Sequence, residues 1–196
     1  NPAATGAPVH PISLPDSEKL WGEGFNFHIL SVGTLKAPKD HATLIRAFAL
    51  LPESLSAKLI ILGEGQLRGE LEDLIRELGL QDKVHLPGFM IDPSPWFRSA
   101  DLFVLSSGYE GFGNVIVEAL ECGVPVVSTD CPSGPAEILD HGRIGKLVPI
   151  RDEESLSRAM TASYFEEHDR RVLMDRAKDF SIERISVQYL DYFWSE

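Results

Sequence analysis

The chain has 196 residues, with 18 lysine and arginine against 30 aspartate and glutamate residues, and its formal net charge is −12. This balance disfavours a nucleic-acid-binding surface, and it disfavours docking of this segment by itself on an anionic membrane. Hydrophobic residues make up 43% and charged residues 24%, which is typical of a globular protein with a well-buried core.

Residues 1–26 are rich in proline, glycine and alanine and show no sustained hydrophobic period. We therefore expect them to form a linker or strap that follows another domain. Residues 27–196 alternate short apolar runs with amphipathic segments, and they are expected to form one domain. Strands are predicted at 27–32, 58–62, 84–86, 102–105, 126–128 and 146–148. Helices are predicted at 41–51, capped by Asp40, and at 66–78, 95–99, 114–122, 133–139, 153–166, 168–179 and 182–194. This alternation predicts an α/β fold with a doubly wound parallel sheet.

The stretch 106–130 contains the strongest candidate site. Its polar loop, 106–113, follows an apolar strand and precedes an amphipathic helix, so the loop lies where ligands of open α/β sheets bind. Gly111, Phe112, Gly113 and Asn114 would present free N–H groups at the start of that helix, which is a natural seat for a phosphate.

Two carboxylates accompany this loop. Glu110 lies within it, and Glu118 follows eight residues later in the helix. By itself, Glu118 could equally be an ordinary first-turn carboxylate that the helix dipole favours.

The loop after the first strand carries Gly33, Lys36 and Lys39. A glycine there lets a ligand approach the backbone, and the lysines could neutralise a diphosphate, although two lysines in a surface loop are more often simply solvated. After the second strand, the turn at residues 63–65 could line a pocket or be a common strand-to-helix turn.

Several other kinds of site are disfavoured. The sequence contains no G-x-x-x-x-G-K-[ST] motif, no G-x-G-x-x-G after the first strand and no G-x-S-x-G elbow. The six histidines have no paired spacing, so no metal site is predicted. Cys122 and Cys131 are expected to be reduced thiols.

Three short motifs resemble the donor-site signature of family-4 glycosyltransferases: Glu110-Gly111-Phe112-Gly113, Glu118-Ala119 and Gly123-Val124-Pro125-Val126-Val127. These are retaining enzymes of the GT-B fold, in which two Rossmann-like domains face a cleft. The resemblance extends over roughly residues 29–156. It covers only the C-terminal, donor-binding half of such an enzyme.

The resemblance implies roles for individual residues. The position of Glu118 binds the ribose hydroxyls of a sugar nucleotide, and Glu110 contacts the donor sugar. Amides of Gly113, Asn114 and Val115 meet the diphosphate.

The basic pair of the family has arginine directly after the glycine and lysine five residues later. Lys39 occupies the lysine position, but Thr34 stands where the arginine is expected after Gly33. We predict that Lys36 substitutes for this arginine. Glu110 and Lys39 are the expected catalytic residues.

The implied reaction moves a glycosyl group from a nucleotide-diphosphate sugar to an acceptor hydroxyl with retention, in polysaccharide or glycolipid assembly. The loop at 130–135 with Glu137 resembles a subset of the family and favours UDP-hexose or UDP-N-acetylhexosamine as donor. No metal or other cofactor is expected. The expected partners are the nucleotide sugar, a missing N-terminal acceptor domain and a saccharide or lipid-linked acceptor.

The resemblance also implies a cytoplasmic protein that is peripheral at the inner membrane face through its missing domain. By itself the chain is expected to bind nucleotide and to be nearly inactive, and apolar residues at 189–194 form either a docking face or ordinary packing. Two alternatives stay open. One is a nucleotide-sugar epimerase or glycogen-synthase-like enzyme with this half-fold, and the other is a non-catalytic α/β interaction domain that binds no nucleotide.

Overall fold

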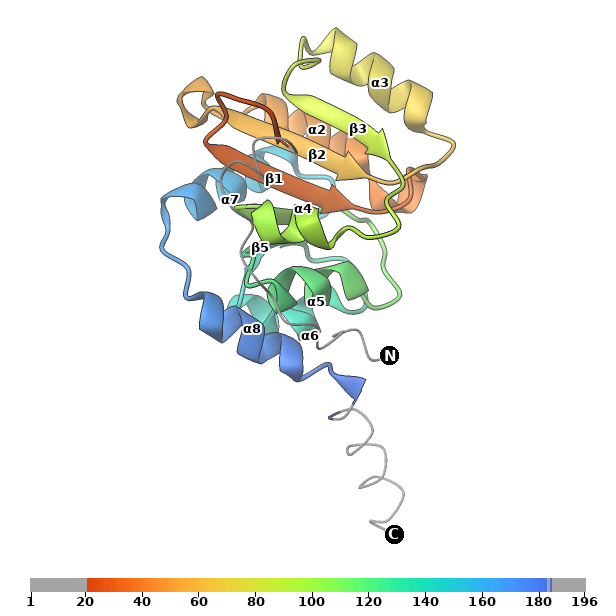
Figure 1. Cartoon of the computed structure of the whole chain (residues 1–196). Helices are drawn as coiled ribbons and strands as arrows, with labels where there is room; N and C mark the ends of the chain where they lie inside the picture. Colours follow the sequence, from red (N-terminus) through yellow and green to blue (C-terminus); the bar gives the residue numbers. More distant parts are fainter. Residues whose placement is uncertain (1–20, 183, 185–196) are drawn as a thin grey trace.

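One parallel sheet organises the computed structural model, which describes residues 21–182 and 184 (Figure 1). Within these residues the sheet has six strands in the order β3-β2-β1-β4-β5-β6, and every neighbouring pair is parallel. The strands are β1 (Phe27–Val32), β2 (Ala57–Leu62), β3 (Val84–Gly88), β4 (Leu102–Leu105), β5 (Val126–Thr129) and β6 (Lys146–Val148). The predicted doubly wound sheet is confirmed, and each predicted strand is present.

Helices cover both faces of this sheet. They are α2 (His41–Ala49), α3 (Arg68–Glu77), α4 (Ser94–Ser99), α5 (Asn114–Glu121), α6 (Pro135–Ile138), α7 (Glu153–Phe165) and α8 (Arg170–Lys178), with short 3-10 turns η1 (Ala37–Lys39), η2 (Glu53–Leu55) and η3 (Asp140–Gly142). Side chains of α2, α3 and α7 pack on one face, and those of α4, α5, α6 and α8 pack on the other.

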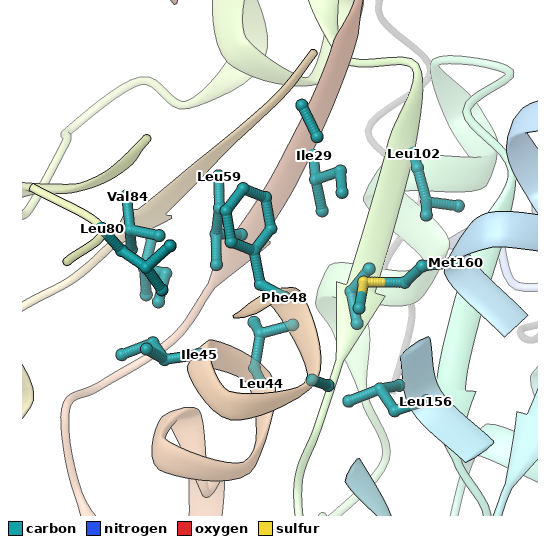
Figure 2. Close-up of a cluster of buried hydrophobic side chains, with 14 of the residues drawn as sticks. Ile29, Leu44, Ile45, Phe48, Leu59, Leu80, Val84, Leu102, Leu156 and Met160 are labelled. Atoms are coloured by element: carbon teal, nitrogen blue, oxygen red, sulfur yellow. The ribbon is translucent and has the colours of Figure 1, made fainter. Parts of the chain in front are cut away.

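Strand residues alternate between the two cores because successive side chains of a strand point to opposite faces. Ile29 packs with the α2 and α7 side, whereas Leu30 packs with the α5 and α8 side. Figure 2 shows the first core, in which Phe48 of α2 and Met160 of α7 point toward the strands. Full burial of such a side chain stabilises the fold by about 1.5–3 kcal/mol.

The helix α2 begins and ends for identifiable reasons. The Asp40 carboxylate accepts from the Thr43 backbone N–H and, at 2.8 Å, from the Thr43 hydroxyl, which confirms the predicted cap. The helix ends at Ala49, two residues before the predicted end, because Leu51 precedes Pro52 and the residue before a proline is disfavoured in helical conformation.

The described chain begins at Trp21, which is buried. Its ring stacks on His28 at a centroid distance of 4.9 Å, and its indole N–H donates to Ser99 Oγ at 2.9 Å. The end of the predicted strap therefore packs on the domain. The predicted apolar face at 189–194 lies outside the described residues. In the part of the chain that the structure describes, no helix is both long and apolar enough to cross a membrane.

Candidate functional site

The candidate site lies where the order of the strands reverses. The chain runs from β1 outward to β2 and β3, then returns to place β4 on the other side of β1 and continues outward to β5 and β6. Ile29 and Leu30 of β1 pair with Leu102 and Phe103 of β4. The loops that follow these two strands, 33–40 and 106–113, therefore leave the same edge of the sheet in opposite directions, which opens a crevice between them.

Hydrogen bonds join these two loops. Ser106 Oγ donates to the Lys39 carbonyl at 2.9 Å, and the Gly108 N–H donates to the Pro38 carbonyl, also at 2.9 Å. The Lys39 ammonium donates to Glu110 Oε1 at 2.6 Å. Two loops that are distant in the sequence thus form one continuous wall.

Glu110 is only 7% exposed, and two side chains donate hydrogen bonds to its carboxylate. Besides Lys39, the Ser107 hydroxyl donates to the same Oε1 atom at 2.5 Å. Ser107 is fixed in turn, because its carbonyl accepts from Thr129 Oγ1 at 2.6 Å. Among the described residues Oε2 of Glu110 has no protein partner, so it can accept a hydrogen bond from a ligand hydroxyl.

A hollow of about 650 Å³ opens beside this pair. Its lining residues come from the two loops and the first turn of α5: Lys39, Glu110, Gly111, Phe112, Gly113, Asn114 and Val115. Gly113 begins α5 with φ 98°, and no side chain caps this helix end. The first N–H groups of α5 are therefore available to an anion.

The structure brings together seven of the predicted site residues and leaves the others outside the hollow. Thr34 and Lys36 are exposed and do not line it, and Lys36 makes no ion pair within the described chain. Gly33 lies behind Lys39, whose side-chain carbons would be 3.3 Å from a Cβ on Gly33.

The glycine turn after β2 supports the first loop instead of lining the hollow. A Cβ on Gly63 would lie 1.9 Å from the Gly33 carbonyl oxygen, so only glycine permits this close approach. The alternative reading of this turn, as a structural strand-to-helix connection, is the one that the geometry favours.

Glu118 lies on the second turn of α5, half-buried and outside the lining of the hollow. Burial raises the pKa of its carboxyl, and the nearby Glu121 charge raises it further. The carboxylate is thus partly desolvated before any ligand arrives, which reduces the cost of burying it under one.

Sequence reasoning missed three residues that support the hollow: Ser107, Gly134 and Phe180. Gly134 precedes α6 with φ 100°, and a Cβ there would lie 1.6 Å from the Phe112 carbonyl oxygen. Phe180 contacts the Phe112 ring at a centroid distance of 5.6 Å. A serine after a strand and a glycine before a proline indicate loops, but the local sequence pattern does not predict which distant residues they contact.

Cys122 and Cys131 are free and buried, as expected. Burial raises the pKa of the Cys122 thiol to about 11. Among residues 21–182 and 184, no cluster of three or more histidine, cysteine, aspartate or glutamate side chains has an arrangement that could hold a metal ion.

A sequence family described as "Glycosyl transferases group 1" matches residues 20–180. The chain is 41% identical over 150 residues to a Campylobacter jejuni enzyme named N-acetylgalactosamine-N,N'-diacetylbacillosaminyl-diphospho-undecaprenol 4-alpha-N-acetylgalactosaminyltransferase, a match that covers 76% of this chain and 40% of the relative. It is 35% identical over 173 residues to the lipopolysaccharide core biosynthesis glycosyltransferase LpsE of Rhizobium meliloti, with 86% and 50% covered.

The fold is also similar to solved structures. The crystal structure of Anabaena HepE in complex with UDP matches with a TM-score of 0.81 and 27% identity, covering 95% of this chain and 54% of that one. A structure of the same protein with UDP and glucose matches with the same TM-score and 26% identity. The chain thus spans about half the length of the relatives that it matches or less.

Proposed function

The chain belongs to the group 1 glycosyltransferases, whose GT-B structures its sheet matches, and from this premise we propose that its hollow binds the diphosphate and sugar of a UDP-sugar donor. One observation carries the proposal. A lysine, a carboxylate and an uncapped helix N-terminus, which are the groups that a sugar diphosphate requires, converge on the same hollow.

The diphosphate fits the first turn of α5. Its negative charge would be met by the N–H groups of Gly113, Asn114 and Val115 and by the positive end of the helix. Lys39 supplies a cation at the same place, and Lys36, which is exposed on the same loop, is proposed as a second cation that reaches the phosphates. Gly33 and Thr34 lie outside the lining of the hollow, and their role in donor binding stays a prediction.

The similarity to HepE, which has been solved with UDP and with UDP and glucose, supports the proposal that the nucleotide of the donor is UDP. An N-acetylhexosamine donor agrees with the name of the Campylobacter relative, an N-acetylgalactosaminyltransferase, and we propose a hexose or N-acetylhexosamine as the donor sugar. Glu118, half-buried on the second turn of α5, is proposed to accept hydrogen bonds from the ribose hydroxyls.

We propose that the same groups support transfer with retention at the anomeric carbon. The bond between the anomeric carbon and the β-phosphate oxygen breaks, and its electron pair leaves with the diphosphate, which Lys39 and the α5 amides stabilise electrostatically. The acceptor oxygen bonds to the anomeric carbon on the same face, and its proton passes to the departing phosphate oxygen. Glu110 uses its free Oε2 to orient a hydroxyl of the donor sugar and favours the positive charge that develops on the ring. No step in this scheme requires a metal.

The acceptor is proposed to be a saccharide or a lipid-linked saccharide. The Campylobacter relative carries diphospho-undecaprenol in its name, and LpsE is named for lipopolysaccharide core synthesis. Because this chain matches only about half of such proteins, we propose that a second domain faces the hollow and binds the acceptor. The chain without that domain should bind nucleotide and transfer almost nothing.

The test is thermal unfolding of the chain with UDP, GDP and ADP. Ligand at a hundred times its Kd adds about 2.7 kcal/mol to the free energy of unfolding. We expect UDP to raise the Tm most, and Glu118→Ala to lose most of that shift. Glu154→Ala on the exposed face of α7 is the matched control and should keep the shift.

Either of two results would contradict the proposal. A Tm that no nucleotide changes would favour the non-catalytic interaction domain. A shift that survives Glu118→Ala and Lys39→Met together would place the nucleotide elsewhere.

A further inference from the structure

Phe112 lines the hollow and is flanked by a glycine on each side. It lies between Gly111, which is exposed, and Gly113, which adopts a left-handed φ of 98°. Glycines have the least restricted backbones, so a loop with glycine on both sides of Phe112 is conformationally free unless Phe112 itself is held. The N–H groups at the start of α5 follow directly from this loop.

Phe180 holds the ring of Phe112. The two rings meet edge to face, with centroids 5.6 Å apart and planes inclined at 64°. Phe180 follows α8 and is only 7% exposed, and it does not line the hollow. This contact is therefore packing behind the site, not a surface that a ligand touches.

Arg176 fixes Phe180 from the other side. Its guanidinium lies over the Phe180 ring at 4.8 Å from the centroid, and it pairs with Asp179 at 2.7 Å. The same guanidinium donates to the carbonyls of Glu137 at 2.5 Å and Ile138 at 2.9 Å. Arg176 therefore ties the end of α8 to the carbonyl end of α6.

The start of α6 touches the backbone of the same loop. Gly134, which immediately precedes α6, approaches the Phe112 carbonyl so closely that no Cβ fits between them. Phe112 is thus held at its ring by Phe180 and at its carbonyl by Gly134. Arg176 connects both supports.

We propose that Phe180 is a positioning residue for the nucleotide site, acting through Phe112 to hold the N–H groups of Gly113 to Val115 in place. The inference rests on the proposed function, because it assigns those N–H groups to the donor diphosphate. Without Phe180 the loop must be ordered when the ligand binds, and the ordering cost appears as weaker affinity. The segment directly after α8 thereby supports the donor site although Phe180 does not line the hollow.

The binding test uses isothermal titration of the chain with UDP. Phe180→Leu keeps most of the apolar volume but removes the ring edge, and it should weaken the Kd about tenfold. The matched control is Leu173→Ala, which is buried on α8 but is not part of the Arg176–Phe180–Phe112 contacts. This control should lower the Tm and leave the UDP Kd within about twofold of the parent.

A double-mutant cycle shows whether Phe180 acts through Phe112. In a Phe112→Leu background, Phe180→Leu should have little further effect on the Kd, because the contact is already lost. Equal effects of Phe180→Leu in both backgrounds, or an equal loss of affinity in Leu173→Ala, would overturn the proposal.

Amide hydrogen exchange without nucleotide provides a readout that is independent of the proposed function. Exchange of the Ile116 amide, which donates to the Gly113 carbonyl at 2.8 Å, should be faster in Phe180→Leu than in the parent and unchanged in Leu173→Ala. Unchanged exchange in Phe180→Leu would overturn the inference. A parent chain that binds no UDP would overturn the proposed function instead, and the exchange result would still decide whether Phe180 positions the loop.

Discussion

Lys39 and Glu110, 71 positions apart in the sequence, meet at 2.6 Å across the point where the strand order reverses. The two side chains are 20% and 8% exposed, so solvent screens their attraction only in part. The Ser107 hydroxyl completes the surroundings of the carboxylate. The pair both closes the wall between the two loops and supplies one cation and one acceptor to the hollow.

Lys39→Met should destabilise the chain by about 2 kcal/mol, because it leaves the nearly buried Glu110 carboxylate with the Ser107 hydroxyl as its remaining partner. The double variant Lys39→Met/Glu110→Gln should be less destabilised than the sum of the two single variants. Urea unfolding measures both effects. Strictly additive single effects would show that the pair contributes nothing to stability.

Gly134→Ala should destabilise the chain by more than 2 kcal/mol and weaken UDP binding, since the new Cβ would lie 1.6 Å from the Phe112 carbonyl oxygen. Gly142→Ala is the matched control. Gly142 also has a positive φ, 90°, but a Cβ there meets nothing within 4 Å, so this variant should cost only about 1 kcal/mol of backbone strain. Equal unfolding midpoints for the two variants would show that the close approach of Gly134 is not needed.

Hydrophobic periods predicted the strands and helices because each element buries a regular face, and a regular face leaves a period in the sequence. The pair of loops at the sheet edge was predictable for the same reason. Once the elements alternate, Lys39 and Glu110 must both follow strands at the carboxyl edge. The contact of 2.6 Å between them depends on β1 and β4 being neighbours in the sheet, and hydrophobic periodicity does not encode which strands are neighbours.

Tertiary contacts behind the site left no local signal. Phe180 is one apolar residue after a helix, and its contact with Phe112 depends on how α8 packs against α5 and α6. For Lys36 the sequence predicted a role that the structure does not test. Its position after the first strand predicted a role with phosphate, but its exposed side chain lies outside the hollow, so its role stays a prediction.

Asp40→Ala should cost about 2 kcal/mol, for two separate reasons. It removes the N-cap of α2, worth about 1 kcal/mol, and it places alanine at φ 45°, where a side chain other than asparagine or aspartate is strained. Asp40→Asn keeps an acceptor and tolerates this backbone, so it should lose less than half as much.

Asp152→Ala is the control for Asp40→Ala, because Asp152 caps α7 through Ser155 with an ordinary extended backbone. It should cost about 1 kcal/mol and leave UDP affinity unchanged. Asp40→Ala should also weaken UDP binding, since Asp40 directly follows Lys39. Chemical unfolding and UDP titration of both variants check this, and equal losses in both measurements would contradict it.

His41 should make the chain less stable in mild acid. The ring is 4% exposed, and neither of its nitrogens has a hydrogen-bond partner in the described chain. Burial, together with the charge of Lys39, lowers the pKa of His41 to about 4, although the backbone of Gly33 and Thr34 and the charge of Asp40 oppose the shift. Below an ordinary histidine pKa of about 6.5, the unfolded chain binds a proton that the native chain does not.

Stability must therefore fall as the pH drops from 6.5 towards 4, and above 6.5 His41 contributes no pH dependence. The loss between pH 7 and pH 5 should be about 2 kcal/mol from this one residue. His41→Leu, which removes the titrating group and leaves no unpaired nitrogen, should lose correspondingly less stability over that range. His141→Asn, at an exposed position with φ 53°, is the control and should keep the acid sensitivity of the parent. Urea unfolding at pH 7 and pH 5 measures the free energy of unfolding of each variant. An equal pH dependence in the parent and in His41→Leu would show that the proton taken up on unfolding belongs to another group.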